Sequence, residues 1–70
     1  MKKVTLKDGK SIDMREPKVR DMMAVGEIEN EVEREVALIG NLTELTKEEI
    51  TDLTLADYKK LQVELKSFLS

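Results

Sequence analysis

Few side chains in this sequence have the chemistry that enzymes use. The 70 residues include no histidine and no cysteine, whereas nucleophilic catalysis normally places a serine, cysteine or threonine beside a histidine or lysine. The remaining options are carboxylate pairs, a lysine or the single tyrosine, Tyr58. The carboxylates Glu48, Glu49 and Asp52 fit a helix start and its solvated face, not a calcium loop with acids at alternate positions around a glycine. We therefore expect no catalytic residue, no metal, no cofactor and no enzyme.

The sequence also lacks the usual signals for phosphate and nucleic-acid binding. Gly9, Gly26 and Gly40 stand singly and cannot form a glycine-rich phosphate loop, and one tyrosine with one phenylalanine provides no platform for stacked bases. Residues 21–57 contain eleven Asp/Glu and two Lys/Arg, whereas residues 1–20 contain seven Lys/Arg and three Asp/Glu. The acidic middle argues against a nucleic-acid partner. It permits head-to-tail attraction between copies or contact with a basic partner, or it serves only to keep a small protein soluble.

The length of the chain limits its core. We expect residues 1–70 to form a single small domain, with a β-hairpin over 1–16 and a helical part over 17–70. Without cysteines no disulfide contributes, so capped helices and association with another chain are the remaining sources of stability. The longest apolar runs, Met22–Val25 and Val36–Ile39, have four residues each, so we expect neither a spanning helix nor a signal peptide.

Two short alternating stretches around Asp8-Gly9 predict the hairpin. Their apolar positions are all even-numbered: Val4, Leu6, Ile12 and Met14. A two-residue loop would pair even with odd positions, whereas a three-residue loop, Lys7-Asp8-Gly9, places Val4 opposite Ile12. We favour the longer loop, in which Gly9 takes the left-handed conformation.

Apolar residues at steps of three or four predict a helix over residues 17–39, with Pro17 in its first turn. This stripe consists of Val19, Met22, Val25 (or Met23), Ile28, Val32, Val36 and Ile39. Inside a helix Gly26 costs about 1 kcal/mol relative to alanine, so a kink or break of the helix at Gly26 is an alternative to one continuous helix. Gly40-Asn41 is expected to end the helix.

Two threonines predict further helix starts. Thr46 and Glu49 form the pattern of a capping box. The Thr54 hydroxyl is expected to accept from the Asp57 N–H, and the Asp57 carboxylate to complete a reciprocal cap. These helices are expected over residues 47–53 and 55–69. The predicted fold is α+β, mainly α, with an N-terminal β-hairpin followed by two or three helices.

The apolar helix faces are the candidate functional surface. One interpretation is a core of two packed helices, and the other is a surface that receives a helical partner. The candidate partner-binding residues are Leu61, Leu65, Phe68, Leu69, Val36 and Ile39. The last helix is the preferred site because its apolar residues run to Leu69, where nothing follows to cover them.

Several blocks of the sequence, taken in order, resemble the tail assembly chaperones of contractile-tailed phages of the Mu-like and P2-like kinds. The blocks are VTLKDGK (4–10), MREPKVRD (14–21), LIGNLT (38–43), LTLADY (53–58) and SFL (67–69). Their order and spacing carry more of the similarity than any single block.

The resemblance implies a non-enzymatic chaperone made in the cytoplasm of the bacterial host from a phage or prophage gene. Such a protein binds the helical tape measure protein, keeps it soluble until the tail tube assembles, and is absent from the mature virion. Its family often has two products through a frameshift, and this chain would match the shorter one. Self-association and repeated weak contacts would supply avidity. The alternatives are a small helical DNA-binding regulator, although a recognition helix should be basic, or a structural tail subunit.

Overall fold

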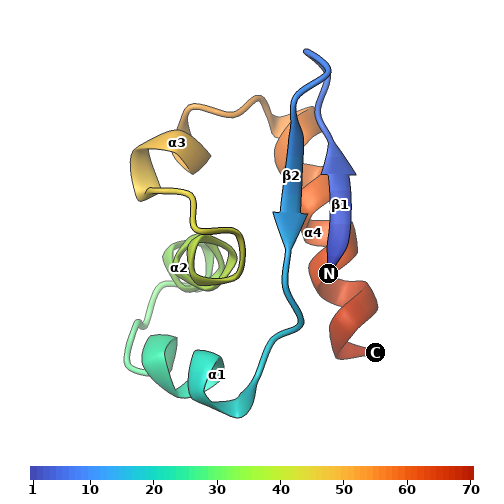
Figure 1. Cartoon of the computed structure of the whole chain (residues 1–70). Coiled ribbons are helices and arrows are strands. Elements are labelled where there is room, and N and C mark those ends of the chain that lie inside the picture. The colour runs from blue at the N-terminus through green and yellow to red at the C-terminus, as the bar shows by residue number, and fades with distance from the viewer.

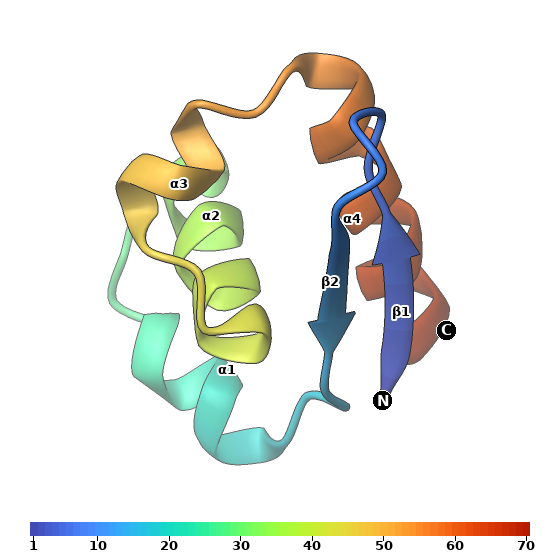
Figure 2. The ribbon, with the colours of Figure 1, turned by 45° about the horizontal axis from the view of Figure 1, so that its top comes forward.

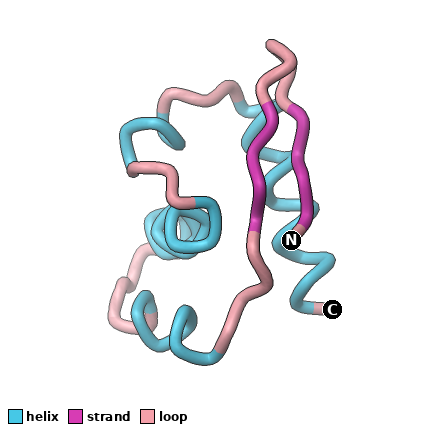
Figure 3. Tube along the Cα trace, in the orientation of Figure 1, coloured by secondary structure: helices cyan, strands magenta, loops and turns pink.

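The computed structural model describes all residues, 1–70, as a hairpin followed by four helices (Figures 1 and 3). The elements are β1 (Lys2–Thr5), β2 (Ser11–Met14), α1 (Val19–Val25), α2 (Glu31–Thr43), α3 (Lys47–Thr51) and α4 (Leu55–Leu69). The chain is 57% helical, which confirms the predicted class of α+β, mainly α. The helices number four, however, and not two or three.

The hairpin has the register that the alternation predicts. β1 and β2 pair antiparallel with Val4 opposite Ile12. The Leu6 N–H donates to the Lys10 carbonyl at 2.7 Å, which leaves three residues in the loop. Gly9 has φ +88°, where a side chain would be strained. The apolar even-numbered residues are buried and the odd-numbered residues of both strands are exposed, so the hairpin has one covered face.

Helices on two sides complete the core. α4 packs beneath β1, while α2 lies beside β2 and carries α1 and α3 on its flanks (Figure 2). The core is one cluster of twelve buried residues: Val4, Leu6, Ile12, Met14, Val25, Val36, Leu38, Ile39, Leu42, Ile50, Leu61 and Leu65. A thin core of this kind has room for only part of the apolar residues, as the length implied.

The first predicted helix is two helices. α1 begins at Val19, after Lys18, so Pro17 lies outside the helix and the prediction of Pro17 in its first turn is wrong. α1 ends at Val25 with Gly26 as its C-cap, which confirms the break. The chain starts a new helix at Asn30, whose side chain accepts from the Glu33 N–H at 3.0 Å. This N-cap was missed, although asparagine followed three residues later by glutamate is a helix-start pattern.

α2 runs past its predicted end. It continues to Thr43 and ends at Glu44, which has φ +64°, so the stop at Gly40-Asn41 is wrong. Leu42 is buried in the core and keeps the extra turn in place. Gly40 instead lets the backbone at Leu45 pass close to α2, because a Cβ on residue 40 would lie 3.1 Å from the Leu45 carbonyl oxygen.

The last two helices begin where the threonines predict. The Thr46 hydroxyl accepts from the Glu49 N–H at 3.1 Å, and the Glu49 carboxylate accepts from the Thr46 N–H at 2.9 Å. This second bond lowers the pKa of Glu49. The Thr54 hydroxyl accepts from the Asp57 N–H at 3.2 Å. No helix of this fold combines the length and the apolar character that crossing a membrane requires.

Candidate functional site

The six candidate partner-binding residues do not form one exposed surface. Ile39 and Leu61 are fully buried, and Leu65 and Val36 also lie in the core. Phe68 is half-buried and packs against the core cluster. Leu69 is 55% exposed. In this conformation a partner can therefore reach only Phe68 and Leu69, at the end of α4.

Other apolar side chains are exposed where the stripe predicted burial. Val19 is 77% exposed, Val32 is 67% exposed and Met22 is 45% exposed, so placing these three in a core-facing stripe is wrong. The break at Gly26 explains the exposure of Val19 and Met22, because α1 is a separate short helix that turns Asp21 and Val25 inward. Val32 lies in the first turn of α2, before the residues that α2 buries. Met23, beside Met22, is also exposed. The outer face of α1 is therefore apolar.

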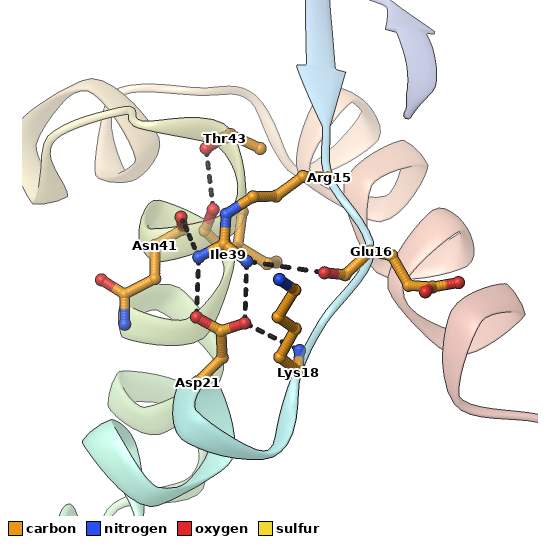
Figure 4. A network of polar contacts seen from close by, with 7 residues as sticks. All are labelled: Arg15, Glu16, Lys18, Asp21, Ile39, Asn41 and Thr43. Atoms are coloured by element: carbon orange, nitrogen blue, oxygen red, sulfur yellow. Dashed lines mark hydrogen bonds and ion pairs between the residues drawn. The ribbon is translucent and has the colours of Figure 1, made fainter.

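Arg15 and Asp21 form a clasp that joins the end of β2 to α1 and α2 (Figure 4). The two guanidinium Nη atoms donate to the two carboxylate oxygens of Asp21 at 2.7 and 2.8 Å. Arg15 also donates to the Asn41 carbonyl at 3.2 Å, and its backbone N–H donates to the Leu42 carbonyl at 3.0 Å. These carbonyls lie in the last turn of α2, where helix carbonyls lack partners within the helix. The clasp thus fixes α1 against α2.

This clasp was missed as a contact, although both residues belong to the block 14–21. A bidentate pair six residues apart across Pro17 has no helical or strand spacing, so periodicity could not reveal it. Arg15 and the Lys18 N–H, which donates at 2.8 Å, hold the pKa of Asp21 well below its ordinary value of 3.8. The same pair raises the pKa of Arg15.

The clasp predicts a loss of stability in acid. Because the folded pKa of Asp21 is lowered, its contribution is complete above pH 3.8, the ordinary value, and decreases as the pH falls toward the folded pKa. Asp21→Asn should melt at a lower temperature than the wild type at neutral pH, and the difference should shrink in acid. Melting curves at a series of pH values measure this. Asp13→Asn, an exposed position on β2, keeps the clasp and should retain the wild-type acid response; an unchanged response in Asp21→Asn would contradict the prediction.

Asp57 has a different partner from the one expected. Its carboxylate does not bond back to Thr54, so the reciprocal cap is wrong. It accepts from the Lys7 N–H at 3.0 Å and lies 3.7 Å from the Lys60 ammonium group. Asp57 is buried, and the bond spans fifty residues of sequence. It therefore attaches the hairpin loop to the start of α4, a structural role.

Asp57→Ala should lower the free energy of unfolding by about 0.5–2 kcal/mol, because the Lys7 N–H loses its acceptor and the first turn of α4 loses a favourable negative charge. Urea denaturation followed by circular dichroism measures the change. Asp57→Asn keeps an acceptor and should lose less. An Asp57→Ala protein with wild-type stability but no partner binding would show that the residue acts in recognition.

Another polar contact, in which Glu35 accepts two hydrogen bonds, joins α2 to α4. The Tyr58 hydroxyl donates to Glu35 Oε1 at 2.6 Å, and the Gln62 amide donates to the same oxygen at 2.7 Å. Burial and the neighbouring carboxylate raise the pKa of the Tyr58 phenol. The lone tyrosine is thus neutral and engaged as a structural donor.

A groove of about 650 Å³ follows α2 between the loop before it and the segment that leads into α3. Its lining includes the apolar side chains of Ile28, Val36, Ala37 and Leu45 and the charged side chains of Glu33, Glu44 and Lys47. No group of three or more Asp or Glu side chains is arranged to hold a metal ion. The lining of the groove is therefore both apolar and charged.

The sequence also matches a known family of proteins. A family profile described as "Phage tail assembly chaperone proteins, E, or 41 or 14" matches residues 2–70. The chain belongs to this family. The match covers the hairpin and all four helices, so it confirms the resemblance seen in the ordered blocks. No curated protein and no solved structure shows a significant match.

Membership sets the general role of the chain. It is a tail assembly chaperone, and a chaperone of this kind acts on a protein of the tail. Its family is one of assembly factors and not generally of enzymes. Exposed apolar side chains lie on α1 and near the end of α4.

Proposed function

We propose that this chain binds the tape measure protein and keeps it soluble during tail assembly, and that it acts by binding and not by catalysis. The family match over residues 2–70 carries the proposal. The exposed apolar side chains support it, since a chaperone needs apolar surface that its own core does not use. The chain would work as a single small domain in the cytoplasm of the bacterial host and would be absent from the mature virion.

The end of α4 is the proposed contact for the tape measure protein. Leu69 is exposed beside the half-buried ring of Phe68, and a large aromatic side chain of this kind often anchors an interface. Val36, Ile39, Leu61 and Leu65 would support this surface from beneath, because they are buried in the same core. A helical segment of the partner would lie across the accessible pair.

Self-association belongs to the same proposal. A tape measure protein is long, so many copies of a small chaperone must cover it. Weak contacts between neighbouring copies would then raise the overall affinity without a strong single contact.

Co-expression with the tape measure protein of the same phage tests the proposal. The wild-type chain should increase the soluble fraction of the tape measure protein and co-purify with it. Leu69→Ser should reduce both, whereas Leu55→Ser, the same change at a position 76% exposed at the other end of α4, should not. Both variants alter exposed side chains and should stay folded.

Three results would contradict the proposal. The first is a tape measure protein equally insoluble with and without the wild-type chain. The second is recovery of the chain in purified particles, which would make it a structural subunit. The third is a shift of duplex DNA at low salt by the wild-type chain, which would favour a DNA-binding regulator.

A further inference from the structure

The outer face of α1 is apolar and has basic neighbours. Val19, Met22 and Met23 are three and four residues apart and share one face, and Val19 and Met23 are 77% and 75% exposed. Lys18 and Arg20 are exposed beside them, and neither forms an ion pair within the chain. Methionine side chains are flexible and adapt to irregular surfaces. We call these five residues the α1 face.

Basic charge continues around this face. Lys18, Arg20 and Arg15 line a hollow of about 320 Å³ that has no acidic lining residue. The guanidinium group of Arg15 is engaged by Asp21, but the other two cations have no partner in the chain. A partner that covers the α1 face would therefore meet positive charge and should itself carry acids.

The groove along α2 has the opposite character. Ile28, Ala37 and Leu45 give it apolar walls, and Glu33 and Glu44 add acids that form no ion pair within the chain. Residues 27–33, which lead into it, contain four glutamates and no lysine or arginine. Lys47 is the one basic residue in the lining. The groove therefore suits an apolar segment with basic neighbours.

We propose that the α1 face of one copy of this chain docks in the α2 groove of a second copy. The inference deepens the proposed self-association and names the surfaces that make it. The two surfaces are complementary in both respects, apolar against apolar and basic against acidic. Two basic α1 faces repel one another, as do two acidic grooves, whereas an α1 face and a groove attract. The charges therefore favour a head-to-tail contact, α1 face to groove, over a contact between two identical surfaces.

The fold leaves both surfaces open at the same time. α1 buries Asp21 and Val25 and leaves its outer face exposed. The groove is lined from the loop before α2, from α2 itself and from the segment that leads into α3. Figure 1 shows that α1 and α3 lie on different sides of α2. One copy can therefore receive a neighbour in its groove while it offers its α1 face to the next. A contact of this type extends into a row of copies. A seven-residue helix buries little area, so each contact is weak and gains strength only through repetition.

Charge reversal on both surfaces tests the docking. The wild-type chain should show a mass in sedimentation velocity that rises with concentration. Lys18→Glu with Arg20→Glu, and separately Glu33→Lys with Glu44→Lys, should each weaken this association by about tenfold or more. An equal mixture of the two variants should associate again, because the reversed α1 face of one matches the reversed groove of the other.

Matched controls separate the docking from general charge effects. Lys59→Glu with Lys66→Glu changes the net charge as much as the α1 reversal does, but on α4, and should associate like the wild type. Met23→Gln should weaken association, whereas Val63→Gln, at a position 65% exposed on α4, should not. Far-UV circular dichroism establishes that each variant is folded.

Each failure has its own meaning. A wild-type chain that stays monomeric at all concentrations overturns both this docking and the proposed self-association. A wild type that associates, with folded variants that associate equally or fail to recover on mixing, overturns the docking alone. Loss of tape measure binding in the α1 variants with unchanged self-association would assign the α1 face to the tape measure protein and would also overturn the docking.

Discussion

Leu61→Ala is expected to leave most of the chain unfolded at room temperature. The side chain of Leu61, on α4, is fully buried and belongs to the core cluster. Replacing a buried leucine by alanine costs about 2–5 kcal/mol through lost burial and the cavity that remains. A single core in a chain of this size rarely supplies more than about 3–5 kcal/mol in total. The helical circular dichroism signal and its urea dependence measure the result.

Val63→Ala is the matched control for Leu61→Ala. It lies two residues away on α4 but is 65% exposed, so its free energy of unfolding should change by less than about 0.5 kcal/mol. A Leu61→Ala protein that unfolds like the wild type would contradict the burial of Leu61. If a folded Leu61→Ala chain also failed to bind the tape measure protein, Leu61 would belong to the interface.

Phe68→Ala is expected to reduce stability by about 2 kcal/mol, less than the roughly 3–5 kcal/mol of a fully buried phenylalanine, because the side chain is only partly buried. The variant should therefore stay folded in water and unfold at a lower urea concentration. It should also co-purify less with the tape measure protein, since the proposed anchor is absent. Urea denaturation and co-purification, measured on the same preparation, give both quantities.

The two roles of Phe68 separate in this comparison. Leu69→Ala, next to it and 55% exposed, should leave the free energy of unfolding within about 0.5 kcal/mol of the wild-type value while it weakens co-purification. A Phe68→Ala chain that is unfolded alone would assign the ring wholly to the core. A folded Phe68→Ala chain with normal co-purification would remove it from the interface.

The sequence by itself determined the parts of the fold that depend on neighbouring residues. The register of the hairpin follows from even-numbered apolar positions and a glycine that takes positive φ, both of which act within a dozen residues. The capping box of Thr46 and Glu49 is also local, and it begins α3 as expected. The family could likewise be identified from ordered blocks of sequence, since a match needs no knowledge of the contacts.

Periodicity did not determine which apolar residues the core covers. A spacing of three or four shows which side chains can share one helix face, but a thin core has room for only some of them. Val19 fits the stripe but is exposed, because the chain breaks between α1 and α2. Val32 is exposed because it lies in the first turn of α2, before the residues that this helix buries. The candidate binding residues divide for the same reason, with Leu61 in the core and Leu69 at the surface.

Only the tertiary structure decided the contacts between distant residues. Asp57 could have capped its own helix, but the hairpin loop brings the Lys7 N–H within 3.0 Å of its carboxylate and takes that acceptor. Arg15 meets Asp21 and the last turn of α2 because the core packs β2 beside that helix. The α2 groove likewise exists only once the loops on either side of α2 are in place. Such contacts depend on how helices and strands pack, and packing joins residues whose separation in the sequence carries no signal.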